Sequence, residues 1–282
     1  MQGLFQPRGA ALFRGWEFRI ALITFLLLAL LAGAGPFFWK LDPLKTNLPD
    51  RLLGPSFVHP LGTDGSGRDL FSRFMHGARI SLTSGVVVVC ASGIIGNVLG
   101  IVAAYFQGIT GTVIMRLLDI LLSFPQMILA MAISICLGPS LESAVVGISL
   151  GCIPVYARLM HSEVMQIRKR QFVSAARLLG FSSPYIFIRH IIPLTAPTML
   201  VQSAAVFGST IISLSALGFV GLGAQIPAPE WGAMISEGMG YTLSGGWWIS
   251  LWPGLGLFLS VAAANMLTNA LNSSIMGRDE AQ

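Results

Sequence analysis

Long runs of apolar residues dominate this chain, and the polar positions gather in the segments between them. The runs are continuous rather than alternating, which is typical of spanning helices and not of the strands of a membrane barrel. A helix that crosses a bilayer needs about 20 mostly apolar residues. The pattern therefore predicts an all-α membrane protein with six transmembrane helices. We expect them at Ile20–Trp39, Ser81–Phe106, Leu117–Leu137, Ser143–Tyr156 with an extension to Met160, Leu194–Leu222 and Trp247–Leu271.

The composition of the chain excludes most other classes of protein. Of the 282 residues, 54% are hydrophobic and only 10% are charged, whereas a soluble domain has about 25% charged residues. Disordered chains and nucleic-acid-binding tails need low hydrophobicity or dense basic runs. The formal net charge of +5 therefore indicates membrane topology rather than a nucleic-acid partner.

Lysine and arginine residues set the predicted orientation. They are frequent in residues 1–19 and 157–193 and absent from the loop after the fifth span, so both basic segments are expected in the cytoplasm. This gives an N-in, C-in chain. The predicted parts are a cytoplasmic tail at 1–19, a first helix at 20–39, an external loop at 40–80, a membrane core at 81–271 with the cytoplasmic loop 157–193, and a cytoplasmic tail at 272–282.

The external loop does not fit the charge rule by itself. Residues 40–80 contain six basic residues, and acidic neighbours count for little in this rule. We place the loop outside because the number of spans and the other loops require it.

Catalytic machinery is missing from the sequence. There is no HExxH or paired-carboxylate arrangement. A Walker A loop needs a glycine before its lysine, but Lys40, Lys45 and Lys169 follow tryptophan, leucine and arginine. We therefore expect a protein that is not an enzyme and has no cofactor or metal of its own. If it pumps, its energy comes from another subunit.

A few polar residues lie within the predicted spans. Asp119 follows Arg116 by three positions, a spacing that lets the two side chains pair on one helix face. This favours a structural ion pair over a substrate site. Asn97 and Asn265 are expected to form hydrogen bonds between helices.

Glycine and proline residues indicate close packing and bends. Gly-x-x-x-Gly in a spanning helix lets two backbones approach closely, either beside a transport pathway or in ordinary packing. Proline within a span predicts a kink. The positions are Gly96 with Gly100, Gly147 with Gly151, Pro125 and Pro154.

The cytoplasmic loop between the fourth and fifth spans has its own helical pattern. Gln166–Leu179 contains neither glycine nor proline and predicts a helix. Gly180 ends it, Ser182 and Pro184 begin another, and Pro193 marks the entry to the fifth span. The small residues here form either a surface for another protein or a plain connector, and composition alone favours the connector.

In this loop the chain resembles a known signature. FVSAARLLGFSSPYIFIRHIIP is similar to the E-A-A-x3-G-x9-I-x-L-P motif of ABC importer permeases. The matching residues are Ala175, Ala176, Gly180 and Pro193, and the departures are Ser174 for Glu, His190 for Ile and Ile192 for Leu.

Two further segments resemble the peptide and nickel branch of that family. HPLGTDGSGRDLFSR (His59–Arg73) is similar to its HxLGTDxxGRDxxSR element, and Leu214–Gly238 is similar to its SFLGLGxQPPxPEWGxM segment. Residues 267–272 depart from the acidic run of many relatives. The resemblance covers residues 41–271.

The resemblance implies a type I ABC importer permease fold and the C-type permease subunit of a dipeptide, oligopeptide or nickel importer in the bacterial inner membrane. The implied partners are a homologous B-type permease, two ATPases that hold ATP and magnesium, an extracytoplasmic substrate-binding protein and membrane lipid. It also implies that Gln171–Ser183 is a coupling helix. The coupling residues would be Ser174, Ala175, Ala176, Gly180, His190 and Pro193.

Alternatives remain open at three points. The substrate is a peptide or a nickel or metal-chelate complex, and a self-contained ion-coupled carrier or channel is the alternative of another class. His59, Asp64 and Asp69 could be metal ligands, but turn and capping roles are favoured. Glu230–Gly232 faces either a binding protein or the packed rim of the membrane domain, and packing is slightly favoured.

Overall fold

The computed structural model describes residues 16–39, 41–106 and 108–279, and this part of the chain is almost entirely helical. No β-strand occurs among these residues, where an isolated bridge joins Thr63 and Asp69. The α-helices are α2 (Trp16–Phe38), α3 (Leu70–Phe106), α4 (Gly108–Leu122), α5 (Gln126–Leu137), α6 (Leu141–Ile167), α7 (Gln171–Leu178), α8 (Ser183–Ile186), α9 (Ile192–Val220), α10 (Trp231–Thr242) and α11 (Trp248–Asp279). A 3-10 turn, Leu48–Asp50, and a π-helical turn, Phe187–Ile191, complete the described elements.

The predicted all-α membrane fold is confirmed. Five segments are long and apolar enough to cross a bilayer: α2, α3, α6, the stretch from α8 through α9, and α11. The predicted kink at Pro125 is confirmed within the third predicted span, Leu117–Leu137. That span is a pair of helices, α4 and α5, bent by 84°. Pro125 stands at the start of α5 and has no backbone N–H with which to continue α4.

Several predicted boundaries differ from the observed ones. The external loop ends at Asp69 rather than at residue 80, because the Asp69 carboxylate accepts a hydrogen bond of 2.8 Å from Ser72 N and starts α3 there. The fourth span continues to Ile167, and α11 continues through most of the predicted tail at 272–282. Most of the predicted N-terminal tail, 1–19, lies outside the described residues, and α2 already begins at Trp16.

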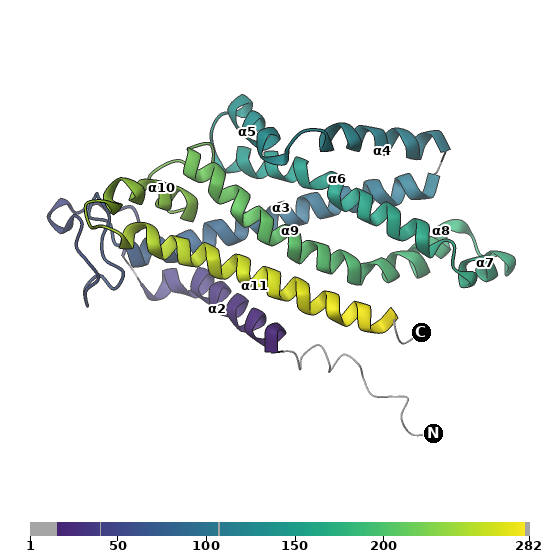
Figure 1. Ribbon diagram of the computed structural model, residues 1–282, viewed down its shortest axis with the longest axis horizontal. Helices are drawn as coiled ribbons and strands as arrows, with labels where there is room; N and C mark the ends of the chain where they lie inside the picture. Colours follow the sequence, from purple (N-terminus) through teal and green to yellow (C-terminus); the bar gives the residue numbers. More distant parts are fainter. Residues whose placement is uncertain (1–15, 40, 107, 280–282) are drawn as a thin grey trace, which may run out of the picture.

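The helices form one elongated bundle in which α3 packs along α6 (Figure 1). The contact depends on glycine. A Cβ atom on Gly96 would lie 2.6 Å from the carbonyl oxygen of Ile153, and one on Gly100 would lie 2.5 Å from that of Ala157. A Cβ atom on Gly147 would lie 2.9 Å from the Cα atom of Ala130 in α5. The predicted close approach of backbones is therefore confirmed at Gly96, Gly100 and Gly147, whereas Gly151 meets the side chain of Gln126.

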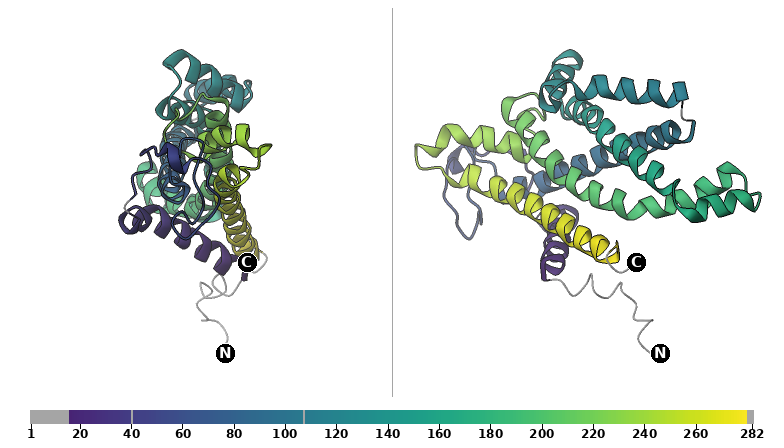
Figure 2. Two further views of the ribbon diagram at one scale, coloured as in Figure 1. Left: turned by 90° about the vertical axis from the view of Figure 1, so that its left-hand side faces the viewer. Right: turned by 45° about the vertical axis from the view of Figure 1, so that its right-hand side comes forward.

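The bundle has two different ends (Figures 1 and 2). Residues 41–69 and α10 form one end, which we call the α10 end. The segment of α7 and α8 extends from the other, which we call the α7 end. The start of α2 and the end of α11 point toward the α7 end, so both run in the direction that the N-in, C-in prediction requires.

Candidate functional sites at the two ends of the bundle

The backbone at the α7 end turns sharply twice. Arg168–Arg170 form a turn between α6 and α7, so the predicted continuous helix over Gln166–Leu179 is wrong. Gly180 then has a φ of +84°, a left-handed conformation that favours glycine. As predicted, a new helix follows, with Ser182 before its first turn and Pro184 within it. We call Gln171–Ile186 the coupling segment.

Apolar contacts anchor the coupling segment to the bundle. Val173 of α7 and Ile186 of α8 are buried in one cluster with Phe187, Met160 of α6 and residues of α3. The ring of Phe187 lies 4.8 Å from that of Tyr105 at the end of α3, edge to face. The segment is therefore packed against three spans and is not a loose connector.

Arg168 adds a polar anchor at the turn. Its guanidinium donates a hydrogen bond to the carbonyl oxygen of Ala104 and lies 5.6 Å from the centre of the Phe187 ring. Partial burial, together with the positive charge of Arg177, lowers the pKa of this guanidinium from its ordinary value, but arginine remains protonated in proteins. These contacts hold the turn between α6 and α7 against the end of α3.

The outer face of the coupling segment is apolar and exposed. Leu178 and Leu179 are 89% and 77% exposed, and Phe181 is also exposed. Ser174 and Ala175 are exposed on α7, whereas Ala176 is half-buried against the anchoring cluster. Large exposed apolar side chains outside a membrane span indicate a protein-binding surface.

The remaining predicted coupling residues lie where the segment returns to the bundle. The ring of His190 is 6.5 Å from Phe172 of α7 and 5.9 Å from Tyr185 of α8, and Pro193 is exposed in the first turn of α9. The structure thus brings His190 next to α7. Sequence reasoning missed Leu178 and Leu179, although two adjacent leucines in a basic loop were a usable signal.

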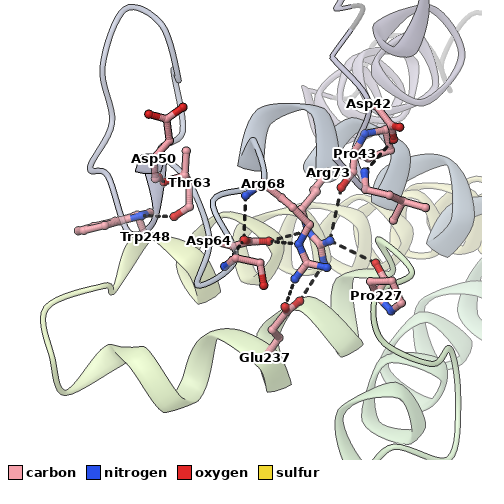
Figure 3. Close-up of polar contacts among 12 residues, drawn as sticks. Asp42, Pro43, Asp50, Thr63, Asp64, Arg68, Arg73, Pro227, Glu237 and Trp248 are labelled. Carbon is pink, nitrogen blue, oxygen red and sulfur yellow. Dashed lines mark hydrogen bonds and ion pairs between the residues drawn. The ribbon is translucent and has the colours of Figure 1, made fainter. Parts of the chain in front are cut away.

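A buried ion-pair cluster lies at the α10 end (Figure 3). The Arg68 Nε donates to Asp64 Oδ2 over 2.7 Å, and the Arg73 Nη2 donates to Glu237 Oε2 over 2.8 Å. Arg68 also pairs with Glu237, and the Arg73 Nε is 3.4 Å from Asp64 Oδ2. Three of the four side chains are almost completely buried, Glu237 being slightly exposed. We call these four residues the outer cluster.

The outer cluster connects segments that are far apart in sequence. Asp64 and Arg68 belong to the loop 41–69, Arg73 begins α3, and Glu237 comes from α10. Arg73 also donates to the carbonyl oxygen of Pro227 in the loop before α10, over 3.2 Å. The sequence did not predict Glu237 as a partner of Arg73. The two residues are 164 positions apart, and sequence patterns indicate contacts only between residues that are close along the chain.

Asp69 and His59 brace the same loop. The Asp69 carboxylate accepts hydrogen bonds from Trp39 Nε1 at 2.9 Å and from Ser72 N at 2.8 Å, and its Oδ1 lies 2.8 Å from His59 Nδ1. Asp64 accepts from the backbone N–H groups of Ser66 and Arg68. These contacts are the turn and capping roles that the sequence favoured over metal ligation.

Glu230 is buried at the start of α10. It is 2% exposed, its Oε2 accepts a hydrogen bond of 2.9 Å from Ala233 N, and its Oε1 lies 3.1 Å from Ser81 Oγ of α3. Burial raises the pKa of this carboxyl above its ordinary value, although its hydrogen bonds to Gly232, Ala233, Ser81 and Ser215 oppose the shift. Trp231 is completely buried, so the Glu230–Gly232 segment packs the rim of the bundle.

Asp119 pairs with two arginines. The predicted Arg116 contact is present at 3.8 Å, and Arg158 of α6 forms a closer ion pair with the same carboxylate. The pair joins α4 to α6 and was missed because Arg158 lies in a different predicted helix. The predicted hydrogen bond of Asn97 is not made by its Oδ1, which is buried without a partner among the described residues.

Comparison with known proteins gives a consistent set of relatives. The family described as binding-protein-dependent transport system inner membrane component matches residues 96–276. The dipeptide transport system permease protein of Alkalihalophilus pseudofirmus is 38% identical over 256 residues, which cover 91% of this chain and 83% of that protein. The nickel transport system permease protein of Escherichia coli is 36% identical over 263 residues, which cover 92% and 94% of the two chains.

A solved structure has a similar arrangement of helices. A chain of the methionine ABC transporter in an inward-facing conformation aligns with a TM-score of 0.54 at 16% sequence identity. The alignment covers 72% of this chain and 97% of that chain. The similarity therefore extends over nearly the whole of the solved chain and shows a common fold.

Proposed function

This chain belongs to the family of binding-protein-dependent transport system inner membrane components, and from that premise we propose that it forms half of an import pathway for dipeptides and oligopeptides. It has the fold of a type I ABC importer permease. It is a transport subunit, and ATP is hydrolysed by separate ATPase subunits. None of the three lysines follows a glycine, so the chain has no Walker A loop, which agrees with ATP hydrolysis by a separate subunit.

The observation that carries the proposal is the coupling segment. Its inner side is packed against α3, α6 and the start of α9, while Leu178 and Leu179 face away from the bundle. A partner that binds the outer face differently in two states shifts the segment, because a ligand moves an equilibrium only through its differential affinity. The packed inner side then transmits the shift to three spans.

The six predicted coupling residues have distinct parts in this proposal. Ser174 and Ala175 form an exposed surface of small side chains on α7 that allows a close approach of the partner, and Ala176 packs α7 against the anchoring cluster. Gly180 makes the turn after α7, and His190 keeps α7 and α8 in contact with the start of α9. The exposed Pro193 lies in the first turn of α9, where the movement would enter the bundle.

The proposed assembly contains more than this chain. Its partners are a homologous B-type permease, two ATPases that hold ATP and magnesium, and an extracytoplasmic substrate-binding protein. We place the assembly in a bacterial inner membrane with the α7 end in the cytoplasm. The basic residues around the coupling segment favour this orientation.

A peptide is the proposed substrate, and a nickel or metal-chelate complex is the second candidate. Relatives named for dipeptide transport are 37–38% identical to this chain, and the relative named for nickel transport is 36% identical. The peptide is favoured because the dipeptide relatives come from several bacteria, among them Alkalihalophilus pseudofirmus and Pseudomonas aeruginosa.

The test is a Gly180→Arg substitution in the reconstituted importer. The new side chain has space, since nothing lies within 4 Å of the Cβ position, but the left-handed backbone at φ +84° is strained for any residue other than glycine. We expect ATP hydrolysis to continue while peptide uptake falls at least tenfold. Gly245→Arg is the matched control, because Gly245 has a φ of +96° and an equally open Cβ position but lies between α10 and α11.

Two outcomes contradict the proposal. One is normal uptake by the Gly180→Arg importer. The other is a purified chain that binds no ATPase and still transports peptide in liposomes without ATP, which is the behaviour of a self-contained carrier or channel.

A further inference from the structure

A groove of about 680 Å³ opens on the side of the bundle between α2 and α3. From α2 it is lined by Ala29, Gly33 and Phe37, and from α3 by Arg79 and Val87. The lining positions recur every three or four residues along each helix, so each helix offers one face to the groove. The lining is almost entirely apolar, and Arg79 is its charged residue.

The groove matches one leaflet of a bilayer in length. The lining positions of α2 run from Phe25 to Phe37 and those of α3 from Arg79 to Val87, which correspond to about 18 Å and about 12 Å at about 1.5 Å per residue. One leaflet supplies about half of a hydrocarbon core that is about 30 Å thick. Phe25 and Phe207, whose ring centres are 5.7 Å apart, close the inner end.

Arg79 marks the outer end of the groove. It is exposed, and none of the ion pairs found among the described residues includes it. It is also the last charged residue of α3, since Ile80–Phe106 contains none. The guanidinium therefore lies where the apolar span begins, at the depth of lipid headgroups.

We propose that this groove binds an anionic phospholipid, with one acyl chain between α2 and α3 and the headgroup phosphate on Arg79. Guanidinium groups bind phosphate through paired, charge-assisted hydrogen bonds. An acyl chain gains little by leaving the bilayer for an apolar groove, because both surroundings are apolar. Preference for this lipid therefore comes from Arg79, while the groove fixes the position of the chain.

The alternative occupant is a helix of the second permease subunit. The charge favours the lipid, because an arginine at the membrane boundary matches a phosphate, and a helix inserted here would leave it facing an apolar contact. The proposal does not depend on the transported substrate, so failure of the peptide assignment leaves it intact.

The experiment uses the assembled importer in nanodiscs of equal parts phosphatidylglycerol and phosphatidylcholine, followed by mild detergent extraction and native mass spectrometry. We expect the wild-type complex to retain phosphatidylglycerol in preference to phosphatidylcholine. Arg79→Gln should lower the retained phosphatidylglycerol about fivefold, the effect of one basic residue near a membrane surface. Arg79→Lys should retain most of it, because the charge is kept.

A second variant tests the groove itself. Nothing lies within 4 Å of a Cβ atom on Gly33, which lines the groove, so Gly33→Phe places its ring in the groove and should also release the lipid. Leu30→Phe is the matched control, because Leu30 is exposed on α2 outside the lining. If either Arg79→Gln or Gly33→Phe does not fold, the proposal is tested by the other variant together with the lipid preference of the wild-type complex.

Three results overturn the proposal. They are equal retention of the two lipids by the wild-type complex, unchanged retention in the folded test variants, and efficient disulfide formation between Gly33→Cys and a cysteine in the second permease. The last result would assign the groove to the interface between the two permeases.

Discussion

The Arg73 Nη2 atom donates a hydrogen bond of 2.8 Å to Glu237 Oε2, and 164 positions of sequence separate the two residues. The contact fixes the start of α3 to α10. Arg73 is 1% exposed, so its charge depends on the two carboxylates of the outer cluster for compensation. Replacing a buried pair by apolar residues can be nearly neutral, but removing one partner is costly.

We expect Glu237→Gln to destabilise the protein by about 3–5 kcal/mol, because it leaves the two buried arginines with only the Asp64 carboxylate. Thermal unfolding of the purified importer measures the effect. The matched control is Glu142→Gln, which changes an exposed carboxylate in the first turn of α6 and should have little effect. An unfolding midpoint for Glu237→Gln equal to that of the control would mean that the cluster does not stabilise this end.

Glu230 predicts a pH dependence of stability. Burial raises the pKa of Glu230 in the folded protein, so the folded state holds the proton more tightly than the unfolded state. The stability that this proton adds is fully present below the ordinary glutamate pKa and is lost as the pH rises through the pKa of the folded protein. The unfolding midpoint of the wild-type protein should therefore fall as the pH increases over this range.

Glu230→Gln should remove that part of the dependence, because its amide oxygen still accepts from Ala233 N and the side chain cannot ionise. Unfolding midpoints of the two proteins over a pH series provide the comparison. An equally steep fall in the Glu230→Gln protein would assign the dependence to another group.

The exposed leucines of the coupling segment can be tested without disturbing the bundle. Leu178→Ser and Leu179→Ser remove apolar surface that is already in water, so the unfolding midpoint should change little. Binding of the ATPase should weaken at least tenfold for the double variant, as expected when central apolar anchors of an interface are removed. Leu243→Ser is the control, because Leu243 is fully exposed at the opposite end. Equal loss of ATPase binding in the control would contradict a specific role.

Packing of α3 on α6 predicts different outcomes for two glycines of one helix. Gly96→Ala places a methyl group 2.6 Å from the Ile153 carbonyl oxygen and should cost about 1–3 kcal/mol, because backbone atoms must move. Gly93→Ala meets the Tyr156 ring at 3.6 Å, an ordinary contact. It should be neutral or slightly stabilising, since alanine is the better helix former. Thermal unfolding of both variants compares them, and similar midpoints would contradict the close packing.

The spans were predictable from sequence because each is set by a local property, a long run of apolar residues. The bend at Pro125 was only partly predictable, since proline indicates a kink but not an angle of 84°. The coupling segment was found through its resemblance to the permease signature, because composition alone favoured a plain connector. Its exposed leucines become meaningful only when the fold shows which side chains face water.

The outer cluster accounts for part of the basic charge of the loop 41–69 and the start of α3, the charge that weighs against the proposed external placement of this loop. Arg68 and Arg73 are buried in ion pairs, and Arg51 lies 5.9 Å from the centre of the Tyr241 ring. These residues have structural partners and do not act as free charges. Sequence could not show this, because Glu237 and Tyr241 come from a helix near the other end of the chain.

The outer cluster also has an evolutionary consequence. A relative that loses the carboxylate at position 237 retains two buried arginines, so selection should favour a compensating change at position 68 or 73. Substitutions at positions 68 and 73 are therefore expected to be correlated with substitutions at position 237. A chimaera that takes the loop and start of α3 from one relative and α10 from another should fold only when both parents carry the same set of charges.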